Sequence, residues 1–314
     1  MEPGSITVVI PTFDRLELLR ATVRSVEEQE RPAARIVVVD DGSRDGSAEW
    51  ADAQSTVTVL RNPEGGWGPA RARAEGSRLA DAEMIAFLDS DDLLLPGALA
   101  DLGAALEGSP SAPFAFARAL AASREPGGWQ PAGLIRPEPR ELRDPLPALF
   151  ARNFVPSVGT LLRGEALERI GGYPTDVTFA EDHYFWIRLA QLGDPVYVNA
   201  LTAVYRVHAG GRHTPGRAEE EADAFLDLIA ADPRLAPARA GRLGVQLTET
   251  AAPSFPRDPA GLARKLRAGL AGQPDKARIL AAAARFWRDR RDRDAAGLRL
   301  WAEDPALRAW LAAY

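Results

Sequence analysis

The sequence predicts an α/β protein with a parallel sheet and crossover helices. Two observations support this prediction. In the first hundred residues, short apolar runs rich in β-branched side chains alternate with segments of helical periodicity. Three of these runs also end directly in polar or acidic residues, which right-handed connections would bring to one edge of the sheet.

The first two expected strands each lead into a polar segment. Residues 6–10 form the first strand, and a helix is expected from about Asp14. Asp14 and Glu17 stand at capping-box spacing before the apolar stripe of that helix. Residues 36–39 form the second strand, which ends in the polar residues 40–43 (DDGS).

The third and fourth strands are expected over residues 57–60 and 84–88. Between them, residues 61–69 are too rich in glycine and proline for regular structure, and a helix begins at about Ala70. A loop placed against a helix N-terminus suits anions. Polar strand ends at one edge of an open α/β sheet are typical of a nucleotide site.

The second half of the chain is less regular. Residues 123–147, which are rich in proline and contain Gly127 and Gly128, are expected to form a long loop or flap. The elements expected after this loop are a strand at 158–162, a helix at 165–170, a helix from Asp182 to about Gly193, and strands near Val196 and at 201–205.

Composition restricts the chemistry. The chain has no cysteine, so any metal must be held by aspartate, glutamate, histidine or backbone oxygen, which favours Mg²⁺ or Mn²⁺. The N-terminus has no basic stretch followed by an apolar one, as a signal peptide would, and no apolar run approaches the ~18 residues that span a bilayer. We therefore expect a cytoplasmic protein. Arginine supplies all but two of the 38 basic residues, which we attribute to coding bias rather than to nucleic-acid binding.

The acidic cluster at residues 89–92 directly follows the apolar strand at 84–88. A desolvated carboxylate is costly unless it is paired, hydrogen-bonded or bound to metal. The cluster therefore predicts hard oxygen ligands for a divalent cation at the open end of the sheet. The alternative is a solvated turn in which an aspartate caps the next helix.

Four ordered segments resemble a known family. They are residues 8–12 (VVIPT), 38–43 (VVDDGS), 87–92 (FLDSDD) and 181–182 (ED). Over residues 5–210 the chain resembles the family 2 glycosyltransferases of GT-A fold. The resemblance implies a mixed central sheet flanked by helices, with a C-terminal α-helical extension. It also implies a hexosyltransferase-type enzyme that moves a sugar, with inversion, from a nucleotide diphosphate sugar to an acceptor hydroxyl.

The same resemblance assigns donor-binding residues. Pro11, Thr12 and Asp40 match residues that hold the nucleotide base, with Asp40 accepting a hydrogen bond from a base N–H; a β-turn is the plain alternative for Asp40. Arg73 matches the arginine of an Ala-Arg-Asn motif, in which Ala74 here replaces the asparagine. Without the family, Arg73 would be interpreted as a surface arginine.

The metal and diphosphate residues follow from the family's D-x-D motif. Asp89 matches the position that touches the ribose or the metal, and Asp91 matches the metal ligand, with Mn²⁺ or Mg²⁺ as the expected cofactor. Asp92 is expected to lie behind them. His208 matches a position that approaches the metal or diphosphate, and Arg206 is a candidate diphosphate contact or a structural ion pair.

Asp182 is the candidate general base, which would remove the proton of the attacking acceptor hydroxyl. Its alternative role is a helix N-cap, because helical periodicity begins directly after it.

The two ends of the chain differ in charge. Residues 1–214 carry 21 arginines and 30 acidic residues, whereas residues 215–314 carry 17 basic and 14 acidic residues. We therefore expect a catalytic domain over 1–214 and an α-helical region over 215–314. Within the latter, the basic residues of 257–293 with interleaved apolar ones predict a solvated basic face; a membrane-surface or acceptor-binding helix pair is the alternative.

Rival functions remain open. A sugar nucleotidyltransferase should carry a glycine-rich loop after the first strand, where this chain has residues 11–15 (PTFDR). A non-catalytic nucleotide-sugar binding module is the rival outside enzymes. A processive polymerase is disfavoured, because no Gln-x-x-Arg-Trp signature follows Asp182. The expected partners are a UDP-, GDP- or dTDP-sugar and a glycan, lipid-linked or small-molecule acceptor. Homo-oligomer formation and contact with the inner face of the membrane are further possibilities.

Overall fold

The computed structural model describes residues 4–176, 181–208 and 276–314. These residues form two compact units. The first contains residues 4–136, 155–208 and 296–314, and the second contains 137–154 and 276–295. The expected boundary at residue 214, and the expected helices up to residue 275, lie outside the described residues.

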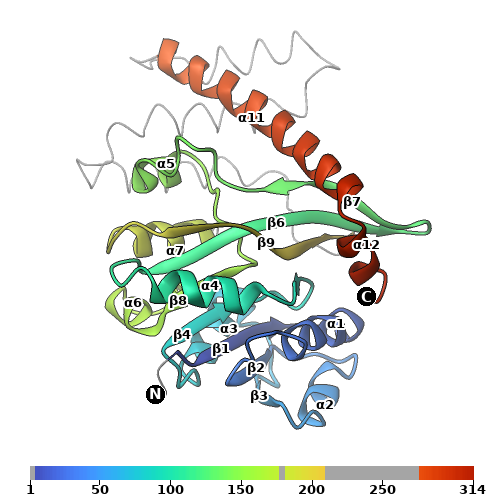
Figure 1. The fold of residues 1–314 in the computed structure, drawn as a ribbon. Coiled ribbons are helices and arrows are strands. Elements are labelled where there is room, and N and C mark those ends of the chain that lie inside the picture. Colours follow the sequence, from blue (N-terminus) through green and yellow to red (C-terminus); the bar gives the residue numbers. More distant parts are fainter. Residues whose placement is uncertain (1–3, 177–180, 209–275) are drawn as a thin grey trace. The chain divides into compact units, whose positions relative to one another are not determined.

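The first unit is built on one mixed sheet (Figure 1). Its strand order is β3-β2-β1-β4-β8-β6-β9-β5, with β7 beside β6. The strands are β1 Ile6–Thr12, β2 Arg35–Asp40, β3 Val57–Arg61, β4 Met84–Phe87, β5 Leu93–Leu94, β6 Phe114–Glu125, β7 Gly128–Ile135, β8 Thr160–Arg163 and β9 Val196–Val207. β1 to β4 pair in parallel with one another, so their carboxyl ends share one edge. The predicted α/β class is confirmed.

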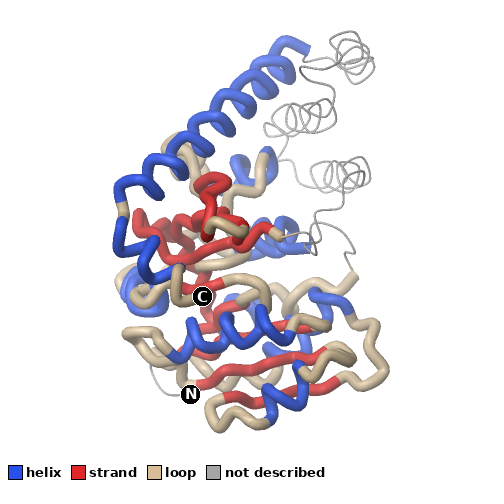
Figure 2. Tube along the Cα trace, turned by 90° about the vertical axis from the view of Figure 1, so that its right-hand side faces the viewer, coloured by secondary structure: helices blue, strands red, loops and turns tan. Residues whose placement is uncertain are grey.

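Helices cover this sheet (Figure 2). They are α1 Leu16–Glu27, α2 Ser47–Asp52, α3 Gly68–Ser77, α4 Ala98–Glu107, α6 Gly164–Arg169, α7 Glu181–Ala190 and α12 Pro305–Leu311. α11, Lys276–Glu303, begins in the second unit and ends in the first. Among the described residues, no helix has the length and apolar character needed to cross a bilayer.

The core explains why the first strands form where they do. Every residue of β1 is buried, as a central parallel strand covered on both faces requires. α1 packs Leu19, Val23 and Val26 into the same core at helical spacing. These contacts fix the strand ends, and with them the residues that follow.

The start of α1 differs from the prediction. Helix α1 begins at Leu16, and Asp14 lies before it with a left-handed φ of 48°. The Leu16 N–H donates to the carboxylate of Asp45, at 2.8 Å, while the carboxylate of Asp14 accepts from the N–H of Arg44. The capping box is therefore wrong, because the acceptor for the helix N-terminus comes from the loop after β2.

The predicted loop at 123–147 is also wrong in its first half. β6 and β7 form an antiparallel hairpin with its turn at residues 126–127. Pro126 lies in that turn, and Pro131 follows a register shift in the ladder. Among the described strands, β7 pairs only with β6, so its other edge forms no hydrogen bonds to a neighbouring strand. A proline, which lacks an N–H, can therefore lie in β7 without removing a hydrogen bond from that edge. The two short strands expected near Val196 and at 201–205 are one irregular strand, β9.

The described C-terminal residues 305–311 form α12, which packs against the sheet of the first unit. Asp304 caps α12 by accepting from the Leu307 N–H at 2.9 Å. Leu307 and Leu311 are buried in a cluster with side chains of β5, β6, β7 and β9. The described residues 276–303 and 305–311 are helical, and α12 contributes to the core of the first unit.

The second unit contains α5, Pro145–Ala151, and most of α11. Arg152 pairs with the buried Glu141, whose carboxylate also accepts from the Glu138 N–H at 2.6 Å. Arg140 forms an ion pair with Asp289 of α11. Ion pairs therefore join the described parts of this unit.

Candidate functional site

The ends of β1 and β2 place two unpartnered oxygens side by side. Thr12 and Asp40 are opposite each other in the parallel register, and each is 3% exposed. One oxygen of the Asp40 carboxylate accepts from the N–H groups of Gly42 and Ser43, at 3.2 Å each. Its other oxygen and the Thr12 hydroxyl have no hydrogen-bond partner among the described residues. Asp40 thus closes a turn and keeps one buried acceptor oxygen unpartnered within the described part of the chain. Pro11 precedes Thr12 on the same buried strand.

The glycine-rich loop before α3 is held by a carboxylate of the protein itself. Asp41 accepts from the Asn62 amide at 2.7 Å, the Trp67 N–H at 2.9 Å and the Gly68 N–H at 2.8 Å. An anion at the start of α3 was expected, and Asp41 supplies one. The loop approaches this turn so closely that a Cβ at Gly65 would lie 3.1 Å from the Asp41 carbonyl oxygen. Asp41 therefore determines how α3 begins.

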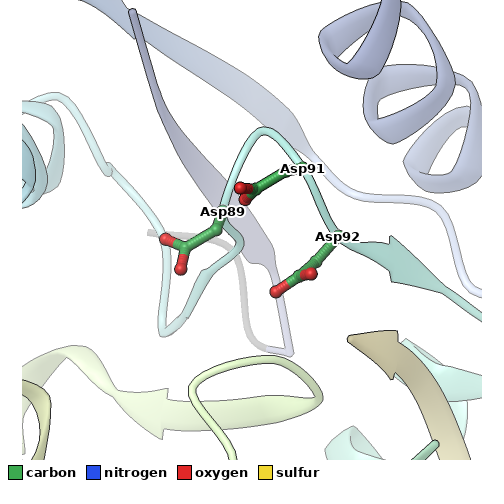
Figure 3. A group of neighbouring side chains, drawn as sticks. All are labelled: Asp89, Asp91 and Asp92. Atoms are coloured by element: carbon green, nitrogen blue, oxygen red, sulfur yellow. The ribbon is translucent and has the colours of Figure 1, made fainter. Parts of the chain in front are cut away.

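Three carboxylates converge after β4 (Figure 3). One oxygen atom from each of Asp89, Asp91 and Asp92 lies within 4.8 Å of the others. Burial raises the pKa of Asp92 well above its usual range, and the charges of Asp89 and Asp91 raise it further. Carboxylates this close repel one another unless a cation or proton lies between them.

Asp91 already has two cationic or polar partners. Its carboxylate contacts the guanidinium of Arg15 and lies 2.9 Å from Nε2 of His208. His208 comes directly after β9, so the end of that strand positions its side chain beside residues 89–92, here called the acidic turn. The structure therefore brings Asp91, His208 and Arg15 together.

Arg206 lies behind the acidic turn. Its guanidinium donates to the carbonyl oxygens of Leu18, at 3.0 Å, and of Asp91, and to the Thr22 hydroxyl at 2.8 Å. Its backbone N–H donates to the Asp92 carboxylate at 2.9 Å. Burial lowers the pKa of Arg206 to about 10, against the opposing charges of Asp92 and Asp91. This geometry favours the structural alternative for Arg206 over contact with a diphosphate.

Arg73 joins the acidic turn to the start of α7. Arg73 is 5% exposed, and its guanidinium pairs with Asp89 and lies 3.5 Å from Glu181. It also donates to the buried hydroxyl of Tyr173 at 3.3 Å. Burial lowers the pKa of Arg73, but the charges of Asp89 and Glu181, the Tyr173 hydroxyl and the hydrogen bond to Asp89 together outweigh this and raise the pKa above its ordinary value. Arg73 is therefore a buried, paired cation rather than a surface arginine.

Asp182 lies in the first turn of α7, next to Glu181. Its carboxylate accepts from the Ser157 hydroxyl and from the His183 N–H, at 2.7 Å each. Burial raises the pKa of the Tyr173 hydroxyl, and the charges of Asp182 and Asp89 both add to that rise. The buried Tyr173 hydroxyl therefore interacts electrostatically with both Asp182, the candidate base, and Asp89 of the acidic turn.

Sequence reasoning missed several residues of this site. Arg15 and Ser157 contact the predicted carboxylates Asp91 and Asp182, and Tyr173 accepts a hydrogen bond from Arg73. Asp41 supports the loop that begins α3. Arg15 could have been found from the sequence, because it lies four residues after Pro11 in the segment that follows β1. Ser157 is 25 residues from Asp182 and Tyr173 is 100 residues from Arg73, so the fold brings these partners together.

The donor set fits a hard divalent cation. Oxygen ligands from carboxylates are what Mg²⁺ and Mn²⁺ prefer, and a cation would relieve the repulsion among Asp89, Asp91 and Asp92. One Asp92 oxygen is buried without a partner among the described residues. This edge of the sheet therefore has oxygens of Thr12 and Asp40, unpartnered within the described residues, on one side and the three carboxylates of residues 89–92 on the other.

Solved structures share this architecture. TarS of Staphylococcus aureus, residues 1–349 in complex with UDP-GlcNAc, superposes with a TM-score of 0.61 at 16% identity, covering 94% of this chain and 89% of that one. A mannosyltransferase from Pyrobaculum calidifontis in complex with GDP-Man and Mn²⁺ gives 0.57 at 23% identity, covering 95% and 88%. The fold is thus that of the GT-A glycosyltransferases.

Sequence comparison then gives the family. Residues 7–170 match the family model for glycosyl transferase family 2, and the chain belongs to that family. An uncharacterized protein of Mycobacterium tuberculosis is 31% identical over 204 residues, covering 59% of this chain and 61% of the relative. An uncharacterized glycosyltransferase of Haemophilus influenzae is 25% identical over 186 residues, covering 59% and 62%. The chain thus spans about three fifths of these two relatives.

A third relative has a more specific name. A β-1,3-glucosyltransferase of Campylobacter jejuni, which acts on GalNAc(5)-diNAcBac-PP-undecaprenol according to its name, is 34% identical over 107 residues. The match covers 31% of this chain and 33% of that protein.

Proposed function

We propose that this protein transfers a hexose from a nucleotide diphosphate sugar to an acceptor hydroxyl, with inversion and with a divalent cation. The observation that carries the proposal is the convergence of Asp89, Asp91 and Asp92 within 4.8 Å at the carboxyl edge of the parallel strands. In an open α/β sheet, that edge is where nucleotides bind.

The donor would lie along this edge. The unpartnered oxygens of Thr12 and Asp40 would accept hydrogen bonds from the base of the donor. A base without matching N–H groups would leave these buried acceptors unsatisfied, which would favour one base over another. Asp91 would hold Mn²⁺ or Mg²⁺ with help from Asp89 and His208, after exchanging its contact with Arg15. When bound, that cation offsets the negative charge on the departing diphosphate.

Asp182 would act as general base. The acceptor hydroxyl gives its proton to the Asp182 carboxylate while its oxygen forms a bond to the anomeric carbon. On the opposite face, the bond from that carbon to the diphosphate oxygen breaks, and the nucleoside diphosphate leaves with the electron pair. Ser157 donates to Asp182 at 2.7 Å and so orients the carboxylate. Arg73 would position Asp89 and Glu181 relative to each other.

The solved relatives support this donor class. TarS was crystallised with UDP-GlcNAc, and the Pyrobaculum mannosyltransferase with GDP-Man and Mn²⁺. These two donors carry different bases, uracil and guanine, so the proposal covers both UDP- and GDP-sugars. A sugar nucleotidyltransferase would need a glycine-rich loop after the first strand, and this chain has residues 11–15 (PTFDR) there instead. Contact with the inner face of a membrane, and self-association, stay predictions.

A thermal-shift panel tests the donor class. The full chain is heated with UDP-, GDP- and dTDP-sugars, each with and without Mn²⁺. A ligand that binds the folded state raises the melting temperature by mass action. We expect one base to give a Mn²⁺-dependent rise. If every nucleotide sugar leaves the melting temperature unchanged, the transferase proposal fails.

The variant Asp182→Asn separates catalysis from binding. The amide is close in shape to the carboxylate but cannot take a proton, so donor binding should persist while transfer falls by roughly 10²–10⁴-fold. Donor affinity and sugar transfer are measured on the same preparation. Transfer at the wild-type rate would contradict the assignment of Asp182, and it would favour the helix-cap alternative.

A further inference from the structure

A cavity lies in the first unit between the β6–β7 hairpin and the C-terminal helices. Its volume is about 410 Å³, within the range of small-molecule sites. The residues that line it are Arg124, Gly127, Gly128, Trp129, Gln130, Trp301, Arg308 and Ala312. Among the described residues, the cavity includes none of the predicted site residues.

Two arginines give this cavity its charge. Arg124, exposed on β6, donates to the main-chain oxygen of Tyr314, and Arg308, half-buried on α12, donates to the carbonyl oxygens of Trp301 and Ala302. The partners of Arg308 are neutral carbonyl groups, so these contacts do not compensate its positive charge. With Arg124 beside it, the cavity therefore favours an anionic ligand. Arginine can also bind phosphate or carboxylate through two parallel hydrogen bonds.

The rest of the lining suits a sugar ring. Trp301 is half-buried and offers an aromatic surface on which the apolar face of a pyranose can pack. Gln130 is exposed and supplies both an amide donor and an amide acceptor for hydroxyl groups. Trp129 is 8% exposed, and its indole N–H has no partner among the described residues. A plain inorganic anion would use the arginines and leave these groups unused.

The strand register places the cavity near the candidate active site. β6 and β9 are parallel, and Ser123 lies opposite Val207. Arg124 follows Ser123 just as His208 follows Val207, so their main chains are separated by about one strand spacing, ~5 Å. His208 in turn contacts Asp91 at 2.9 Å. A chain of sugars with one residue in the cavity could therefore continue toward the acidic turn.

We infer that this cavity binds a negatively charged sugar unit of the acceptor, one that bears a phosphate or a carboxylate. The inference rests on the proposed transferase function, and it narrows the acceptor to anionic glycans. Arg124 and Arg308 would pair with the anionic group while Trp301 packs against the ring. The reacting hydroxyl would belong to a neighbouring part of the same acceptor.

Calorimetric titration of the full chain tests this inference with three probes: glucose 1-phosphate, a glucuronic acid oligosaccharide and neutral glucose. The variant Arg124→Gln removes one charge from an exposed position, and circular dichroism verifies its folding. The matched control is Arg169→Gln, which alters an exposed arginine of α6 outside the cavity.

At least one charged probe should bind, and neutral glucose should bind at least tenfold more weakly. Arg124→Gln should weaken the charged probe by about tenfold, since it removes a charge-assisted contact, and Arg169→Gln should leave it unchanged. Preference for glucose 1-phosphate indicates a phosphate-bearing acceptor, and preference for the glucuronate an acidic glycan. Equal binding of glucose, unchanged affinity in Arg124→Gln, or no binding of either charged probe overturns the inference. The donor-induced thermal shift of the wild-type protein tests the transferase proposal separately.

Discussion

Replacing Asp41 with alanine should destabilise the protein strongly, although Asp41 is not expected to touch a substrate. The side chain is 8% exposed and accepts three hydrogen bonds, from Asn62, Trp67 and Gly68. These donors connect the turn after β2 to the loop that begins α3. Asp41→Ala leaves all three without their acceptor.

The size of the effect follows from those contacts. A hydrogen bond to a charged group contributes about 1.5–3 kcal/mol, so three would sum to an upper bound of about 4.5–9 kcal/mol. The Trp67 and Gly68 N–H groups are only partly buried, so water can replace the carboxylate there. We therefore expect the free energy of unfolding to fall by about 3–5 kcal/mol. Because Arg73 lies on the same helix, donor binding should weaken as well.

Urea denaturation followed by circular dichroism measures this change. Glu64→Ala is the matched control, because Glu64 is an exposed residue of the same loop and its loss should change stability by no more than about 0.5 kcal/mol. If Asp41→Ala costs less than about 1 kcal/mol, the value of one neutral hydrogen bond, the carboxylate does not anchor the loop.

Two further predictions concern packing and polar contacts around the site. Gly76→Ala should destabilise by about 1–3 kcal/mol, because its Cβ would lie 2.5 Å and 2.7 Å from valine side chains of β1 and β2. Urea denaturation measures this loss, and Gly127→Ala, which meets nothing within 4 Å, should lie near wild type. Tyr173→Phe should cost about 1–2 kcal/mol in the same measurement, because Arg73 loses a buried acceptor. An equal loss in Tyr184→Phe, whose hydroxyl is less buried, would refute that reasoning.

The parallel half of the sheet could be predicted because its strands are continuous apolar runs. β1, β2 and β4 are buried almost throughout, so burial and sequence pattern agree. The acidic turn followed for the same reason, since residues 89–92 come one residue after the end of β4. Local pattern sufficed wherever one strand and its end determined the placement.

The hairpin at β6 and β7 could not be predicted from local pattern. Proline and glycine normally indicate a loop, but Pro126 lies in the turn and Pro131 lies beside a register shift. Whether a proline interrupts a strand depends on which edge of that strand is paired. Strand pairing is a property of the fold, and the sequence of the hairpin alone does not contain it.

The same limit applies to the site. Asp14 has the spacing of a helix cap, yet Asp45, about thirty residues later in the chain, caps α1. Arg73 looks like a surface residue until Asp89, Tyr173 and Glu181 surround it. These contacts join segments far apart in sequence, so only the assembled sheet reveals them.

Calorimetric titration of the donor against Asp91→Ala tests the central claim most directly. The donor is the nucleotide sugar that gives the largest thermal shift, titrated with and without Mn²⁺. We expect wild-type binding to depend on Mn²⁺, and Asp91→Ala to bind at least tenfold more weakly and without regard to Mn²⁺. Asp101→Ala, an exposed aspartate of α4, should behave as wild type. If Asp91→Ala keeps wild-type affinity and Mn²⁺ dependence, the acidic turn is not the metal and diphosphate site.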